Sequence, residues 1–177
     1  ETFEEMISRN TERISSLIDE LLKSARPAEL EKVHAVLQDI LDAALDFCQD
    51  RIDLLNVELK KVVPDEPIEG RWDPEKMKIA FVNIITNAIE AMSKVENPKL
   101  VVSISEQDDR PVVFIKDNGK GMDQETQNSL YDPFFTNRKN GMGLGMTATF
   151  NIINMHNGTI RLNSAEGKGT EFMISLA

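Results

Sequence analysis

The sequence predicts an α/β (α+β) two-layer sandwich, in which helices cover one face of a mixed, mostly antiparallel sheet. Two observations support this prediction. Long stretches with apolar residues at helical spacing alternate with short stretches in which every second residue is apolar. Polar or glycine-containing turns join neighbouring strand patterns, as they do in hairpins. The interleaved helices must bury their apolar sides, and a sheet provides the surface on which they can do so.

The composition is that of a globular domain. The chain has 177 residues, of which 41% are hydrophobic and 28% charged. It has no apolar run near the roughly 18 residues of a membrane span and no signal peptide, and its single cysteine, Cys48, fits a reducing compartment. We therefore expect a cytoplasmic fragment of a longer protein, which the sequence leaves open to membrane anchoring. The net charge of −10 argues against nucleic acid as a partner.

The N-terminal third contains two predicted helices and a strand. Residues 1–25 have an apolar seam at a spacing near 3.5, which favours a coiled-coil or bundle helix that needs a partner. Packing of this helix on its own domain is the alternative. Arg26 and Pro27 end the helix. A second helix is predicted over 30–48 and a strand over 56–63.

Asp73 and Pro74 begin the next helix, because Asp can cap a helix and Pro is favoured at the first helical position. This helix is expected to run to about residue 93. The remaining expected elements are strands over 100–105, 112–116, 159–164 and 170–176 and helices over 124–130 and 144–156.

Asn83 and Asn87 lie one turn apart in the helix that begins at Pro74. Asn is unfavourable inside a helix, so two of them on one face need a reason. Amide oxygens are ligands for Mg²⁺, which takes its other ligands from water and from substrate phosphates. The alternative is that both are solvated surface amides. They belong to a narrow stripe that lies opposite the apolar face of this helix. The residues of this stripe are Lys76, Ala80, Asn83, Asn87, Glu90 and Lys94.

Two glycine-containing motifs follow. Asp117 comes directly after a strand, in DNGKGM, where a carboxylate can accept a hydrogen bond from the adenine amine while glycines let the backbone approach the ring. By itself this motif could equally be a plain turn. The motif GMGLGM precedes a helix, and its backbone amides can form a nest for phosphate. In order, the asparagines and the two motifs predict an ATP site with a magnesium ion.

Residues 131–140, YDPFFTNRKN, lie between the two glycine motifs. Aromatic residues after a proline can anchor a mobile flap. Arg138 and Lys139 are then placed to reach phosphate oxygens when the flap closes.

With these residues assembled, the chain resembles the catalytic, ATP-binding domain of sensor histidine kinases, within the gyrase, heat-shock chaperone, histidine kinase and mismatch-repair ATPase superfamily. The resemblance covers essentially the whole chain and implies a Bergerat-type ATP-binding fold. Residues 1–25 resemble the end of a dimerisation and phosphoacceptor helix, and 26–177 the catalytic domain. The motifs that carry the resemblance are FVNIITNAIEAM, DNGKGM, DPFFTNR and GMGLGM, in that order.

The resemblance implies particular roles. Asn87 would be the main magnesium ligand with Asn83 assisting, Asp117 would read the adenine, and Arg138 and Lys139 would act in catalysis. It implies ATP as substrate and Mg²⁺ as cofactor. The implied partners are the upstream dimerisation domain, a response regulator receiver domain and a second copy of the parent protein. The other residues implied to bind nucleotide are Gly119, Gly121, Met122, Thr136, Gly141, Gly143, Leu144, Gly145 and Thr170.

One position favours a kinase over an ATPase. Members of the superfamily that hydrolyse ATP usually carry a Glu, as general base, where this chain has Asn83. Transfer to a histidine requires positioning more than a base. Neither His34 nor His156 stands in an acceptor setting, so the acceptor is expected outside the chain. A serine/threonine kinase and a nucleotide-gated ATPase of the same superfamily remain alternatives.

Overall fold

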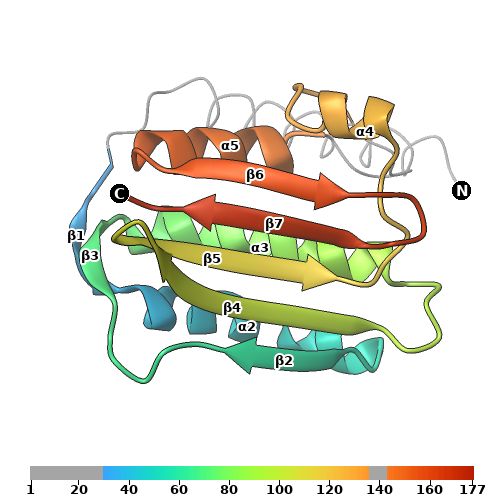
Figure 1. Ribbon diagram of the computed structural model, residues 1–177, viewed down its shortest axis with the longest axis horizontal. Helices are drawn as coiled ribbons and strands as arrows, with labels where there is room; N and C mark the ends of the chain where they lie inside the picture. The colour runs from blue at the N-terminus through green and yellow to red at the C-terminus, as the bar shows by residue number, and fades with distance from the viewer. Residues whose placement is uncertain (1–29, 136–142) are drawn as a thin grey trace, which may run out of the picture.

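The computed structural model describes residues 30–135 and 143–177, which form two layers (Figure 1). A five-stranded sheet with the order β2-β4-β5-β7-β6 forms one layer, and three helices cover one of its faces. The pair β2 and β4 is parallel, whereas the other neighbouring strands are antiparallel. The predicted fold class is therefore confirmed. The strands are β2 (Glu58–Val62), β4 (Lys99–Gln107), β5 (Arg110–Asp117), β6 (Thr159–Ser164) and β7 (Thr170–Ser175), and the covering helices are α2 (Leu37–Leu54), α3 (Pro74–Ala91) and α5 (Gly145–Met155).

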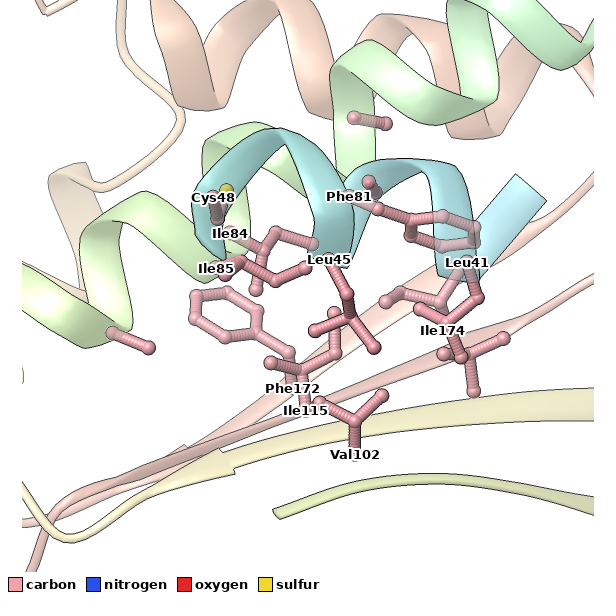
Figure 2. Close-up of a cluster of buried hydrophobic side chains, with 14 of the residues drawn as sticks. Leu41, Leu45, Cys48, Phe81, Ile84, Ile85, Val102, Ile115, Phe172 and Ile174 are labelled. Carbon is pink, nitrogen blue, oxygen red and sulfur yellow. The ribbon is translucent and has the colours of Figure 1, made fainter. Parts of the chain in front are cut away.

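The core lies between the sheet and the helices. Every second residue of β4 is buried, which places Leu100, Val102 and Ile104 on the helix-facing side. Figure 2 shows side chains of α2 and α3 meeting those of the sheet in this layer. Cys48 is among them and is 1% exposed, so it packs as a small apolar side chain.

α3 is the central helix of this layer, packed between α2 and α5. Its N-terminus forms as predicted, because the Asp73 Oδ1 accepts a hydrogen bond from the Lys76 amide at 3.1 Å and Pro74 occupies the first helical position. The residues on the apolar face of this helix are all buried: Met77, Phe81, Ile84, Ile85, Ala88 and Met92.

The prediction for residues 30–48 was wrong at both ends. Residues Val33–Val36 form the strand β1, which pairs antiparallel with β3 (Glu69–Trp72), and α2 then continues to Leu54. β3 was not predicted at all. Valines spaced three apart fit a helix as well as a strand, and only a partner about 35 residues later in the chain decides between them. A short helix, α4 (Gln124–Ser129), agrees with the prediction for 124–130.

Candidate nucleotide-binding site

Asn83 lies on the side of α3 that packs against α5. Its Nδ2 donates hydrogen bonds to the carbonyl oxygen of Gly145 at 3.0 Å and to Oγ1 of Thr149 at 3.2 Å. Because a carbonyl oxygen can only accept, the amide nitrogen faces α5 and Oδ1 is the atom that could bind a cation. Asn83 thereby connects the middle of α3 to the first turn of α5.

The stripe around Asn83 is less exposed than the sequence predicted. Ala80, which belongs to it, is 0% exposed, and Asn83 and Asn87 are half-buried. The reason is that α5 packs along this side of α3. Half-buried amides on a helix flanked by another helix are not ordinary solvated surface residues, so the alternative weighed for them is disfavoured.

The C-terminal end of α3 meets the turn that follows β5. The Lys120 amide donates to the carbonyl oxygen of Ala91 at 3.1 Å. A Cβ atom at Gly119 would lie 2.8 Å from Cβ of Ala91 and 2.7 Å from Oδ1 of Asp117, so only glycine fits there. The turn after β5 is thus fixed on the same helix that carries the two asparagines.

Asp117 ends β5 and is 4% exposed. Its Oδ1 accepts a hydrogen bond from the Gly119 amide at 2.7 Å. Burial raises the pKa of this carboxyl to about 6, although backbone hydrogen bonds from Gly119 and Thr170 act in the opposite direction. A buried carboxylate that meets only neutral donors retains unused acceptor capacity, which is what recognition of an amine requires.

The turn around Gly121 packs against the connection between β6 and β7. A Cβ atom at Gly121, where φ is +65°, would lie 1.9 Å from the carbonyl oxygen of Ala165. The Met122 amide donates to Oγ of Ser164 at 3.0 Å, and the same Oγ lies 2.9 Å from Oγ1 of Thr170. One hydrogen-bonded group therefore brings Met122 and Thr170, two of the residues implied to bind nucleotide, close to Asp117.

The N-terminus of α5 lies across from the asparagines of α3. Its cap position is Leu144, whose side chain makes no capping hydrogen bond, so backbone amides of the first turn are available to an anion. Gly143 has φ of +69°, and a Cβ atom there would lie 2.4 Å from the backbone of Phe134. Phe134 donates its amide to the Gly143 carbonyl at 3.1 Å and itself has φ of +68°, which is rare for an aromatic residue.

Some predicted site residues lie outside the described residues. These are Thr136, Arg138, Lys139 and Gly141, together with the helix predicted over 1–25. The flap is described only as far as residue 135.

The donor set fits magnesium better than a transition metal. Within residues 30–135 and 143–177 there is no group of three or more His, Cys, Asp or Glu side chains that could hold a metal ion. A cation beside α3 would therefore be held by amide oxygens of Asn83 and Asn87 and by ligands from the substrate. Mg²⁺ accepts this arrangement because it prefers oxygen, keeps waters and is often held through phosphate.

Two residues that the sequence analysis missed organise the site. Thr149 is 0% exposed and contacts both Asn83 and the Gly145 carbonyl, and Ser164 connects Met122 with Thr170. Thr149 stands four residues after Gly145, so it lies one turn along α5 on the same face. That spacing was the available signal, but its meaning depends on which helix α5 packs against.

Together these features are those of a nucleotide-binding module. The buried acid can accept from a base, the half-buried amides of α3 can hold a cation, and the N-terminus of α5 behind its glycine turn can bind phosphate. Residues 72–177 match the family described as "Histidine kinase-, DNA gyrase B-, and HSP90-like ATPase". The chain belongs to this family, and the resemblance seen in the sequence is confirmed.

Named relatives are kinases. Sporulation kinase E of Bacillus subtilis is 32% identical over 97% of this chain and 23% of its own length. Sensor histidine kinase ZraS of Salmonella typhi is 27% identical over 97% of this chain and 37% of its own length. The chain thus spans well under half of each relative.

Among the residues that the structure describes, no helix has the length and apolar character that a membrane span requires.

Solved structures share the fold. The catalytic domain of histidine kinase ThkA superposes with a TM-score of 0.74 at 24% identity, covering 83% of this chain and 95% of that domain. ThkA in complex with the response regulator protein TrrA superposes with a TM-score of 0.77 at 22% identity, covering 97% of this chain and 49% of that chain. At these identities the likeness concerns the fold.

Proposed function

We propose that this chain is the ATP-binding catalytic domain of a sensor histidine kinase and transfers the γ-phosphate of ATP to a histidine in an upstream dimerisation domain. In this proposal residues 26–177 are the catalytic domain, and 1–25 are the end of the dimerisation helix and its linker. The relatives named as kinases support the class of reaction. The hydrogen bonds of Asn83 are the main observation that favours phosphoryl transfer over hydrolysis.

Asn83 occupies the position from which a carboxylate would activate water. Its amide nitrogen donates to the Gly145 carbonyl and to Thr149. An amide accepts no proton at neutral pH, and here it joins two helices. Transfer to a histidine needs no such base, because the imidazole nitrogen is already a nucleophile and the enzyme supplies positioning and charge neutralisation.

In this proposal different residues of the site bind different parts of ATP. The Asp117 carboxylate accepts from the adenine amine, and the glycines of its turn admit the ring. The amides of the first turn of α5 donate to phosphate oxygens, assisted by Gly143 and, as predicted from the sequence, by Arg138 and Lys139. Asn87 and Asn83 present oxygens to Mg²⁺, which when bound neutralises phosphate charge.

The partners follow from the same assignment. The parent protein would act as a homodimer through its dimerisation helices and pass its phosphate to a response regulator receiver domain. ThkA is described in complex with such a regulator. A net charge of −10 supports the expectation that nucleic acid is not a partner.

Incubation with γ-labelled ATP tests this function. The chain alone should remain unlabelled, because His156 is buried and His34 lacks an adjacent acid. With the dimerisation domain of the parent protein added, that domain should acquire an acid-labile, base-stable phosphate. Acid-stable label on Ser or Thr would contradict the proposal and indicate a serine/threonine kinase. Rapid phosphate release without labelled protein would contradict it and indicate an ATPase.

Asn87→Ala provides a separate test of the metal site. Loss of one oxygen ligand should remove the gain in nucleotide affinity that Mg²⁺ confers, while the metal-free affinity and the fold are kept. Calorimetry with ADP, with and without Mg²⁺, measures both quantities, and circular dichroism checks the fold. A variant with an undiminished Mg²⁺ effect would exclude Asn87 as a ligand.

A further inference from the structure

α3 and α5 are antiparallel helices joined at two distant places. One is the contact of Asn83 with Gly145 and Thr149, at the start of α5. The other lies at the far end of α5, where the Asp73 amide donates to Nε2 of His156 at 2.9 Å. Since α5 has 11 residues, the two connections are about 16 Å apart along it.

The contact at His156 requires one form of the ring. Nδ1 lies 2.7 Å from the carbonyl oxygen of Ile152, which can only accept, so Nδ1 carries the proton. Nε2 must then be unprotonated to accept from the Asp73 amide. A doubly protonated ring would direct an N–H group at another N–H group and break the contact.

The surroundings of His156 favour the neutral ring. His156 is 2% exposed, and burial lowers its pKa, while the hydrogen bond to Ile152 acts in the opposite direction. The charged groups that act on it are Lys32, Lys76 and the Asp73 carboxylate, of which the two lysines lower the pKa and Asp73 raises it. The Asp73 carboxylate itself accepts from the Lys76 amide and from the Glu31 amide.

We propose that His156 is a positioning residue: its neutral ring fixes the C-terminal end of α5 to the start of α3 and so sets the N-terminus of α5 opposite Asn83 and Asn87. A helix of this length moves as a rod, so loss of one connection lets it pivot about the other. The amides at its first turn would then shift relative to the phosphates, while the Asp117 turn, which belongs to β5 and the end of α3, would stay in place. The proposal rests on the nucleotide site proposed above.

Comparison of two ligands separates this role from general support of the fold. Adenosine reaches only the base side of the site, whereas ADP also uses the first turn of α5. His156→Phe keeps a ring but leaves the buried Asp73 amide unpaired. It should weaken ADP roughly tenfold, equivalent to about 1.4 kcal/mol, and leave adenosine unchanged. Calorimetry at pH 7.5 with both ligands measures the ratio.

His156→Gln is the matched control. Its amide oxygen can accept from Asp73 but does not titrate, so it should restore the ratio of ADP to adenosine affinity at pH 7.5. As the pH is lowered from 7.5 to 4.5, through and below the ordinary range of a histidine, the ratio should fall further in the wild-type protein than in this variant, because only the wild-type ring can take up a second proton. Titration of the ADP phosphate and of Asp117 is common to both proteins. This comparison needs no destabilised protein.

The outcomes are distinguishable. If the wild-type protein binds neither ligand, the proposed site fails. If ADP binds but His156→Phe weakens both ligands equally, or neither, His156 does not position α5 and the inference is overturned. If His156→Phe does not fold, parallel pH profiles for the wild-type protein and His156→Gln overturn the inference, and diverging profiles support it.

Discussion

Two buried aspartates in this domain have opposite electrostatic properties. Asp73 is 5% exposed and Asp117 is 4% exposed, and each directly follows or ends a strand beside α3. Burial alone would raise the pKa of both, yet the pKa of Asp73 is lowered while that of Asp117 is raised to about 6. The small solvent exposure that the two residues share therefore does not by itself determine the pKa of the acid.

Two causes explain the difference in pKa: burial acts more strongly on Asp117, and Asp73 has more hydrogen-bond and charged partners. Asp73 accepts from the Lys76 amide at 3.1 Å and the Glu31 amide at 3.0 Å, and lies 3.3 Å from the Lys76 ammonium. Asp117 receives backbone hydrogen bonds from Gly119 and Thr170, and the causes of its pKa shift include no cation. The oxygens of Asp73 are occupied by hydrogen bonds within the fold. The ionised form of Asp117 is destabilised by burial, and a ligand that donates a hydrogen bond to it can stabilise it.

The largest expected effect is loss of nucleotide affinity in Asp117→Asn. Replacing a charged acceptor by a neutral amide should cost about 1.5–3 kcal/mol of binding free energy, roughly ten- to hundredfold in Kd. Stability should be unchanged or higher, because a buried charge is removed. Calorimetry with ADP and urea unfolding measure the two effects. An unchanged Kd would remove Asp117 from adenine recognition.

Asp73→Ala should show the reverse pattern. It removes the N-cap of α3 and the acceptor for the Glu31 amide, so unfolding free energy should fall by about 1–2 kcal/mol. ADP affinity should be retained, because the Asp73 backbone amide that contacts His156 remains. Urea unfolding measures the loss, and Asp73→Asn, which can still cap, is the control. Equal losses in the two variants would attribute the effect to charge instead of capping.

The sequence predicted the first of these regions more completely than the second. Asp73-Pro74 is a local signal, since a cap and the helix it begins are neighbours in the chain, and α3 formed as expected. The identity of Asp117 was also visible after its strand. Its raised pKa was not, because the cause is burial by β7 and the turn at Gly169, about 50 residues later.

Non-local pairing accounts for the other errors. β1 and β3 were missed because each strand is defined by the other. Ala80 was placed on the stripe opposite the apolar face, although it is buried, because the packing of α5 against α3 cannot be read from either helix alone. The contact of His156 was not predicted, because its partner, the Asp73 amide, is 83 residues away. Patterns within one element were predictable, whereas contacts between elements were not.

The two aspartates should also contribute to stability with opposite dependence on pH. As pH falls from above 6 towards 4, Asp117 takes up a proton in the folded protein before it does so in the unfolded chain, which adds stability by at most about 3 kcal/mol. Nucleotide affinity should fall over the same range, because the acceptor loses its charge. Asp73 contributes in the opposite sense: its stabilisation is present above the unfolded pKa and is lost as pH falls below about 4.

Unfolding and ADP titrations from pH 8 to 4 follow both quantities, and Asp117→Asn is the control. In that variant the gain in stability between pH 6 and 4 should be smaller than in the wild-type protein. An identical stability profile in both proteins would show that Asp117 is not the group with the raised pKa.

The smallest expected effect concerns a third buried polar group, the hydroxyl of Tyr131. It has no hydrogen-bond partner among the described residues, its pKa is raised to about 12 by burial, and its ring lies 5.0 Å from that of Phe150. Unlike either aspartate, this group loses its contact with water without receiving a partner. Tyr131→Phe should therefore leave unfolding free energy unchanged or raise it by up to about 1 kcal/mol, because the ring contact is kept and an unpaired hydroxyl is removed. Tyr131→Leu, which loses the aromatic pair, should be destabilising. Urea unfolding of the three proteins decides the matter, and a loss of more than about 1 kcal/mol in Tyr131→Phe would mean that the hydroxyl does have a partner in solution.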